Sequence, residues 1–149
     1  MKNDHIRRNA NVTEGERSRQ LREDFRPPTA REREILEMLL SVEIPGIAEL
    51  RAQLPYVSVA RWNCGCASFD VAVEKARAPR ASITTSPAVE ATTRERADIT
   101  RTYDLLLWVR DGWLAAVEIV DYVDRHGEDS PAEIPSREEW NAPEGRSAV

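Results

Sequence analysis

The chain has 149 residues, which is enough for one hydrophobic core and too few for two ordinary domains. Hydrophobic residues make up 41% and charged residues 32%, a balance typical of a globular domain with polar ends. No apolar run approaches the length of a membrane span, and no hydrophobic signal core follows Lys2, so we expect a cytoplasmic protein that does not contact a membrane.

Negative charge is concentrated in the last third of the chain. Residues 111–149 hold three Lys or Arg against ten Asp or Glu, and the formal net charge of the whole chain is -5. Such a surface repels phosphate backbones and attracts basic proteins, although a merely solubilising surface has the same composition. The charge balance therefore favours a basic protein over nucleic acid as a partner.

Residues 1–28 are predicted to form a mobile charged arm, because their few apolar residues are surrounded by Arg and Glu. Pro27 and Pro28 end the arm. Its arginines could clamp a phosphate backbone, although interspersed acidic residues weaken that hypothesis. They are Arg7, Arg8, Arg17, Arg19, Arg22 and Arg26.

Two helices are predicted after the arm. Thr29 and Glu32 form a capping-box pattern, and apolar residues at helical spacing follow, which predicts a helix over residues 30–42. A second, shorter helix follows Pro45-Gly46, with one apolar stripe over residues 47–54 and Pro55 as its end. Both stripes need a sheet to pack on.

Alternating apolar residues over 56–63 and 66–74 predict a first hairpin with Cys64-Gly65 as its two-residue turn. That register places one set of side chains on a common buried face: Ser58, Ala60, Trp62, Ala67, Phe69, Val71 and Val73. A slip of one residue would invert the two faces.

Cys64 and Cys66 flank a single glycine. Two thiolates could hold zinc, but a tetrahedral site needs two further ligands, and the histidines lie in the arm and in a distant loop. A disulfide would close a tight ring in a reducing compartment. We therefore expect free thiols, no metal and no cofactor.

The strongest local signal is Asp111-Gly112 between two apolar runs, residues 103–110 and 113–122, because Asp and Gly tolerate the positive φ angles of a type I′ turn. An edge strand is predicted before this hairpin, over residues 88–93. Regular alternation of side chains places five residues of this hairpin on one face of the sheet: Leu106, Trp108, Trp113, Val117 and Ile119. Five others fall on the opposite face: Leu105, Leu107, Val109, Leu114 and Val120.

Glu118 lies opposite Leu105 in this register, among apolar neighbours. A buried carboxylate has a raised pKa and can act as an acid or a binding group. The structural alternative is a carboxylate at the sheet margin that pairs with Arg101 or Arg110, and we favour it. His126 lies in a charged, Gly-containing loop and is expected to be solvated.

The end of the chain is predicted to be extended, because Pro131, Pro135 and Pro143 interrupt it. Residues 136–139 form a second capping pattern that predicts one helical turn carrying Trp140 inward. We expect this segment to cover part of the sheet face opposite the helices, and residues 143–149 to be a frayed tail.

These elements predict an α+β fold. Residues 29–142 form a single domain with two N-terminal helices packed on an antiparallel sheet of four to five strands, followed by an extended Pro-spaced C-terminal segment. The order of helices, Cys-Gly-Cys hairpin, Pro/Thr linker, Asp-Gly hairpin and acidic tail over residues 29–143 resembles a group of small uncharacterised actinobacterial proteins. The resemblance implies a compact α+β domain without a known reaction, similar in general shape to small acidic immunity proteins.

Phosphate-binding glycine loops, metalloprotease helices and nucleophile elbows are absent from the sequence, so no catalytic residue is predicted. We expect a non-enzymatic, immunity- or antitoxin-like protein whose acidic surface with aromatic anchors contacts a partner. The predicted partner-binding residues are Trp113, Asp121, Tyr122, Asp124, Glu128, Asp129 and Trp140. The alternatives are a DNA-associated regulator that uses the arm, and a small-ligand site between helices and sheet with Glu118 as its polar group. The oligomeric state is left open.

Overall fold

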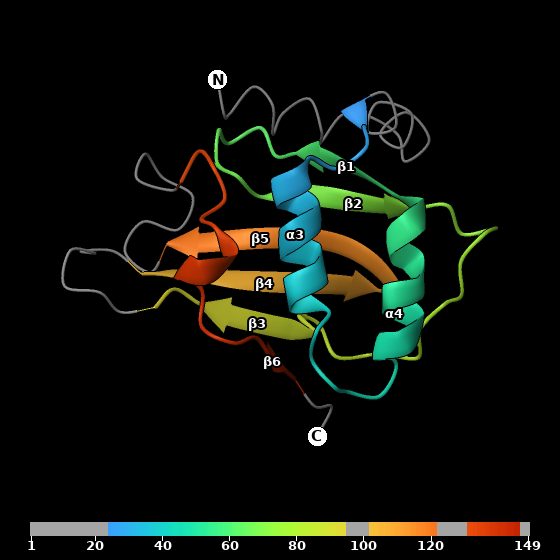
Figure 1. Cartoon of the computed structure of the whole chain (residues 1–149). Coiled ribbons are helices and arrows are strands. Elements are labelled where there is room, and N and C mark those ends of the chain that lie inside the picture. The colour runs from blue at the N-terminus through green and yellow to red at the C-terminus, as the bar shows by residue number, and fades with distance from the viewer. Residues whose placement is uncertain (1–23, 95–101, 122–130, 147–149) are drawn as a thin grey trace, which may run out of the picture.

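Two α-helices lie on one face of an antiparallel sheet, as Figure 1 shows for the computed structural model, which describes residues 24–94, 102–121 and 131–146. The elements in chain order are α3 (Ala30–Leu39), α4 (Ile47–Gln53), the 3-10 turn η1 (Leu54–Tyr56), β1 (Val57–Arg61), β2 (Phe69–Val73), β3 (Val89–Thr92), β4 (Tyr103–Arg110), β5 (Trp113–Asp121), the 3-10 turn η2 (Arg137–Glu139) and β6 (Glu144–Gly145). The strands are ordered β1-β2-β5-β4-β3-β6. The α+β class is confirmed, with six strands instead of four to five.

The capping residues predicted from the sequence set the start of α3. The Thr29 hydroxyl accepts a hydrogen bond from the Glu32 backbone N–H at 3.2 Å, and the Glu32 carboxylate accepts one from the Thr29 N–H at 2.8 Å. The helix ends at Leu39, before the expected residue 42. In α4, Gly46 adopts a φ of 91° at the N-cap, where its lack of a side chain permits the left-handed conformation.

The core lies between the helices and the sheet face that they cover. Removal of each large side chain from water contributes about 1.5–3 kcal/mol. Side chains with no exposed surface come from both layers: Ile35, Leu36, Leu39, Leu50, Phe69, Leu105, Leu107, Val117 and Ile119.

Asp111 and Gly112 form the turn between β4 and β5, with φ angles of 53° and 83°. Both angles are positive, as a type I′ turn requires, so the hairpin prediction is confirmed. The turn packs against the loop before β3, because the Ala81 N–H donates to the Gly112 carbonyl at 3.0 Å.

A β-bulge interrupts the β4–β5 ladder beyond this turn. Val109 pairs with Leu114 but Trp108 pairs with Ala116, so Ala115 is the extra residue on β5. Uninterrupted alternation from Leu114 would place the Glu118 carboxylate beneath the helices, where an unpaired charge costs several kcal/mol. The bulge avoids that cost.

From Val117 onward the bulge exchanges the two faces of β5. Val117 and Ile119 are buried beneath the helices, and Glu118 pairs with Leu106 instead of Leu105. The face prediction is therefore wrong for Val117, Ile119 and Val120, because it assumed regular alternation along the whole strand.

The first hairpin is also displaced by one residue from the expected register. Val59 pairs with Val71, so Ser58 and Ala60 do not share the buried face of Phe69. Cys64-Gly65 is not a two-residue turn, because the Trp62 N–H donates to the Ser68 carbonyl at 3.0 Å and residues 63–67 form the loop. The longer loop is the physical reason for the changed register.

Cys64 and Cys66 form a disulfide within this loop, so the expectation of free thiols is wrong. Their Cα atoms are 5.3 Å apart, within the ordinary range for a disulfide. Gly65 between them has a φ of 80°, which turns the chain back and brings the two side chains together.

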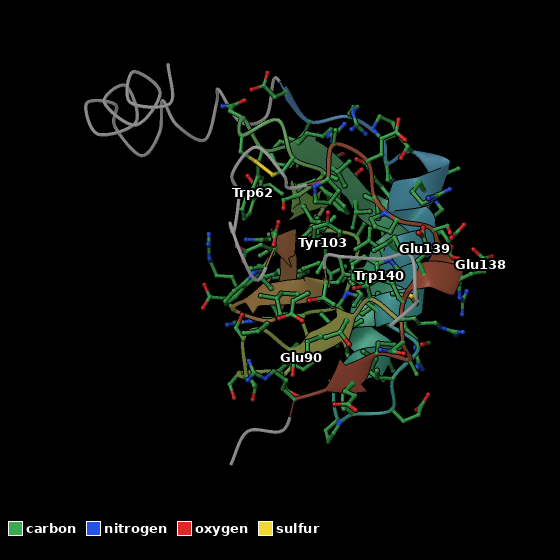
Figure 2. The ribbon with its side chains drawn as sticks, turned by 90° about the vertical axis from the view of Figure 1, so that its left-hand side faces the viewer. Trp62, Glu90, Tyr103, Glu138, Glu139 and Trp140 are labelled. Atoms are coloured by element: carbon green, nitrogen blue, oxygen red, sulfur yellow. A yellow bond between two sulfur atoms is a disulfide. The ribbon has the colours of Figure 1, made fainter. Side chains whose placement is uncertain are left out.

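The C-terminal segment lies on the helix side of the sheet, not on the opposite side as expected. Figure 2 shows Trp140 beside the helices and Trp62 on the other side. The Arg31 guanidinium donates to the Ile134 carbonyl at 2.8 Å, and Trp140 is 1% exposed, which confirms the inward helical turn. The reason is the core space beside α3, which accommodates the indole.

Glu144 and Gly145 pair with β3 as β6, although the sequence suggested a frayed tail from residue 143. As a result β3 is not an edge strand. Arg26, expected in the mobile arm, forms a backbone bridge to Val59 with N···O distances of 2.9 and 2.7 Å. Residues 1–23 of the predicted arm lie outside the described residues, as do Arg101 and His126.

Candidate functional site

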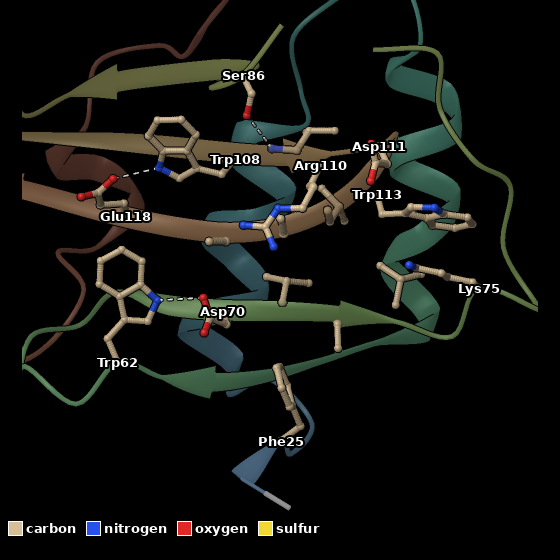
Figure 3. Close-up of a pocket in the computed structure, with 17 residues that line it drawn as sticks. Phe25, Trp62, Asp70, Lys75, Ser86, Trp108, Arg110, Asp111, Trp113 and Glu118 are labelled. Carbon is tan, nitrogen blue, oxygen red and sulfur yellow. Dashed lines mark hydrogen bonds between the residues drawn. The ribbon is translucent and has the colours of Figure 1, made fainter. Parts of the chain in front are cut away.

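The sheet face opposite α3 and α4 carries polar and aromatic side chains, and we call it the open face. It is defined by Trp62, Asp70, Trp108, Arg110, Trp113 and Glu118, all of which line one open cavity of about 960 Å³. Figure 3 shows these side chains projecting from β2, β4 and β5 and, for Trp62, from the residue that follows β1. A sheet face with large aromatic side chains is usually covered in a folded protein. Within residues 24–94, 102–121 and 131–146 no helix or strand covers this face, which makes it a candidate interaction surface.

Two indole–carboxylate pairs organise the open face. The Trp62 Nε1–H donates to Asp70 Oδ1 at 3.0 Å, and the Trp108 Nε1–H donates to Glu118 Oε1 at 2.8 Å. Bonds to an ionised acceptor are stronger than neutral ones, so each carboxylate holds its ring in a fixed orientation. Both rings turn a face outward from the sheet in Figure 3.

Small side chains separate the two pairs. Asp70 lies between Ala60 on β1 and Ala116 on β5, and Ala116 in turn pairs with Trp108 on β4. Ala60 and Ala116 are buried. Because methyl groups rise little above the backbone, the space beside the indole rings stays hollow.

Positive charge on the open face comes from Arg110 and Lys75. The Arg110 side chain is exposed and extends from the end of β4 toward Asp70 in Figure 3. Burial raises the pKa of Asp70, and the Trp62 hydrogen bond and the Arg110 charge offset only part of that rise. Lys75 Nζ lies 5.6 Å from the ring centroid of Trp113, a cation–π distance.

The structure describes three of the seven predicted partner-binding residues, and these three do not share one exposed surface. Trp113 lies on the open face, next to the Asp-Gly turn. Asp121 has no exposed surface and Trp140 is 1% exposed, so neither offers contact area to a partner. Tyr122, Asp124, Glu128 and Asp129 lie outside the described residues.

Sequence reasoning missed the two indole–carboxylate pairs because both depend on the corrected registers. A signal for the bulge was present. On a regular strand, residues an even number of positions apart lie on the same face, so Leu114 would share its face with Glu118 and not with Val117. Burial of both Leu114 and Val117 with Glu118 left outside therefore requires an irregularity between them. Glu118 therefore lies on the open face, not between helices and sheet, and its carboxylate accepts a hydrogen bond from the Trp108 indole.

A second, smaller cavity of about 300 Å³ lies near Arg26, Glu32 and Arg61. Its arginines are engaged within the protein. The Arg26 guanidinium donates to both oxygens of Glu32, at 2.7 and 3.0 Å, and Arg61 donates to the carbonyl of Cys66 at 3.0 Å. We therefore assign it a structural role.

Neither a metal site nor a membrane-spanning helix is found in the described part of the chain. No three His, Cys, Asp or Glu side chains there gather as metal ligands would. None of the described helices combines the length and apolar character needed to cross a bilayer. Comparison of the chain with protein families, curated proteins and solved structures finds no match.

Proposed function

We propose that the chain is a non-enzymatic binding domain that contacts a partner protein through the open face, in the manner of an immunity protein or antitoxin. The observation that carries the proposal is the presence of three half-buried tryptophans, Trp62, Trp108 and Trp113, around one cavity. Tryptophan is the residue most enriched among those that dominate binding energy at protein interfaces. Fixed rings also lose little conformational entropy on binding.

A basic partner fits the charge of this face. By strand register, four half-buried carboxylates share the open side, Asp70, Glu90, Asp104 and Glu118. Three described cations oppose them: Arg110 and Lys75 on the open face, and Arg146, which lies 4.0 Å from the Glu90 carboxylate. Complementary charge steers encounter and fixes the orientation of a complex. The partner's binding surface should therefore carry Lys or Arg next to apolar side chains.

The test compares matched variants against one purified partner. The full chain, used as bait in its native host, provides candidate partners, and each is then purified and titrated calorimetrically. We expect Trp108→Ala and Glu118→Lys each to raise Kd by about 30-fold, which is a loss of about 2 kcal/mol of binding free energy. Glu37→Lys, the same charge change on the exposed side of α3, should leave Kd unchanged.

Thermal unfolding of every variant must accompany the titrations, because Trp108 and Glu118 also bond to each other. If folded open-face variants bind every purified partner as tightly as the unaltered chain does, the proposal is wrong.

A small ligand is the second candidate occupant of the cavity. Its volume of about 960 Å³ falls within the range of small-molecule sites, and aromatic walls with a few polar groups are typical of them. The hypothesis of a DNA-associated regulator gains no such support, since Arg26 is paired with Glu32 and the described open face is acidic.

A further inference from the structure

We propose that Cys64 and Cys66 form a redox site, at which a low-molecular-weight thiol exchanges with the disulfide by attack on the Cys64 sulfur. The inference goes beyond the proposed function and does not depend on it. Its basis is the environment of the two cysteines within the loop of residues 63–67. Figure 2 shows the disulfide at the edge of the molecule, near Trp62.

A disulfide between cysteines so close in sequence is a weak structural crosslink. One residue separates Cys64 from Cys66, so the bond closes a very short loop and constrains the unfolded chain little. The loop has another anchor, because the Ala67 N–H donates to the Pro131 carbonyl at 2.9 Å. The fold should therefore survive reduction of the disulfide.

Solvent reaches the two cysteines unequally. Cys66 is 2% exposed, whereas Cys64 is half-buried and lies between the exposed residues Asn63 and Gly65. A β-carbon at Gly65 would meet no described atom within 4 Å, so this side of the loop leaves room for a thiol to approach. Thiol–disulfide exchange depends on access to the sulfur that is attacked. The external thiolate should therefore attack Cys64 Sγ and displace Cys66 Sγ.

Two groups in the loop stabilise the thiolates that exchange releases. The Arg61 guanidinium donates to the Cys66 carbonyl at 3.0 Å, which places a positive charge beside the cysteine that is displaced. The Cys66 backbone N–H donates to Cys64 Sγ at 3.4 Å, and a thiolate is a stronger acceptor than a disulfide sulfur. Both interactions therefore favour the reduced state.

Exchange with a thiol such as glutathione takes two steps. Its thiolate forms a bond to Cys64 Sγ, and the Cys64–Cys66 bond breaks with its electron pair on Cys66 Sγ, which takes up a proton. A second glutathione thiolate then attacks the glutathione sulfur of this mixed disulfide and releases Cys64, which also takes up a proton. In sum, one protein disulfide is reduced to two thiols, and two glutathione molecules are oxidised to one disulfide.

Trp62 should report the redox state, because it directly precedes the loop. Its backbone N–H donates to the Ser68 carbonyl at 3.0 Å, and its indole N–H donates to Asp70 Oδ1 at 3.0 Å. These bonds hold the start of the loop, and reduction removes the crosslink from the residues that follow. The indole N–H signal of Trp62 should therefore shift on reduction, and that of Trp140, in the core, should not.

The experiment equilibrates the full chain with a series of reduced and oxidised glutathione mixtures, traps free thiols with N-ethylmaleimide and counts them by intact mass. Dithiothreitol, a stronger reductant, forms a second arm. We expect the pair to pass from fully oxidised to fully reduced within the glutathione series, with both thiols appearing together. The circular dichroism spectrum should stay native, and the Trp62 signal should follow the same transition.

Matched variants locate the attacked sulfur. With oxidised glutathione, Cys66→Ser keeps the accessible thiol and should form the mixed disulfide about 10-fold faster than Cys64→Ser, whose remaining thiol is buried. In the chain with both cysteines, Arg61→Gln should slow reduction about fivefold, because the leaving thiolate loses its neighbouring charge. Arg146→Gln removes an arginine near the opposite edge of the sheet and should leave the rate unchanged.

A pair that stays oxidised throughout the glutathione series and is reduced only by dithiothreitol would be a structural crosslink, and the inference would be wrong. Reduction that occurs only with loss of the native spectrum would also overturn it, as would equal rates of mixed-disulfide formation in the two single-cysteine variants. If either variant fails to fold, the glutathione series on the unaltered chain still decides. Partner binding can fail without affecting these results, because none of the measurements needs a partner.

Discussion

Gln53 is the buried side chain that joins the helical layer to the Asp-Gly turn. It is the last residue of α4 and has no exposed surface. Its Nε2 donates to the carbonyls of Pro79 and Gly112, both at 2.9 Å, and its Oε1 accepts from the Leu114 N–H at 3.0 Å. One amide therefore satisfies three backbone groups on two separate segments.

Substitution Gln53→Met keeps the volume of the side chain and removes all three hydrogen bonds. The Gly112 carbonyl retains the Ala81 N–H at 3.0 Å, and the exposed Pro79 carbonyl can bond to water, so one buried group is orphaned, the Leu114 N–H. Each buried, unsatisfied backbone group costs about 1–3 kcal/mol. We expect the free energy of unfolding to fall by about 2 kcal/mol, a sizeable part of the roughly 5–15 kcal/mol that stabilises a typical domain.

Urea unfolding followed by circular dichroism measures this loss. With an m value of about 2 kcal/mol/M, the transition midpoint should fall by about 1 M while m stays constant. Ala52→Met, at an exposed position of the same helix, should change stability by less than about 0.5 kcal/mol. A loss below about 1 kcal/mol for Gln53→Met would refute the reasoning.

Three further predictions concern the turn, one carboxylate and the disulfide. Gly112→Ala should destabilise the chain by about 2 kcal/mol more than Gly65→Ala, as measured by chemical denaturation. Both glycines have a positive φ, but of the two only Gly112 has neighbouring backbone with which a β-carbon would collide. Asp70→Asn should stabilise the chain at pH 7 and have no effect on stability below about pH 3. The reason is that burial raises the pKa of Asp70 in the folded state, so ionisation of this carboxyl lowers stability as the pH rises through that pKa. Equal effects at both pH values would contradict that sign. Reduction of the Cys64–Cys66 disulfide should cost only about 1–2 kcal/mol, since the loop that it closes is very short, and urea unfolding with and without reductant checks this.

Local signals account for the parts of the fold that the sequence predicts well. Three local signals each act within a few residues: the capping box at Thr29, the proline after each helix and the Asp-Gly pair. Their effect can therefore be predicted without knowledge of the rest of the chain. The two helices and the β4–β5 hairpin follow from such signals.

Strand register is the part that local signals do not determine. The bulge at Ala115 depends on the cost of burying Glu118 and on the Gln53 side chain that holds the Leu114 N–H, and Gln53 is 61 residues away along the chain. Similarly, β6 exists because residues 144–145 find the free edge of β3. Long-range contacts of this kind decide which face each side chain occupies.

The errors in strand register also affect the prediction of the candidate site. Its indole–carboxylate pairs form only in the corrected registers, so the sequence located one tryptophan of the open face, Trp113, and instead proposed Trp140, which fills the core. The composition of the site was visible as four tryptophans in a small chain, but their distribution between the two faces was not.

The central claim is that the open face contacts the partner. The most direct measurement compares the indole N–H signals of the free chain with those of its complex with the purified partner. The account predicts that the signals of Trp62, Trp108 and Trp113 shift or broaden and that the signal of Trp140 does not. Unchanged signals for the first three in a saturated complex would contradict it.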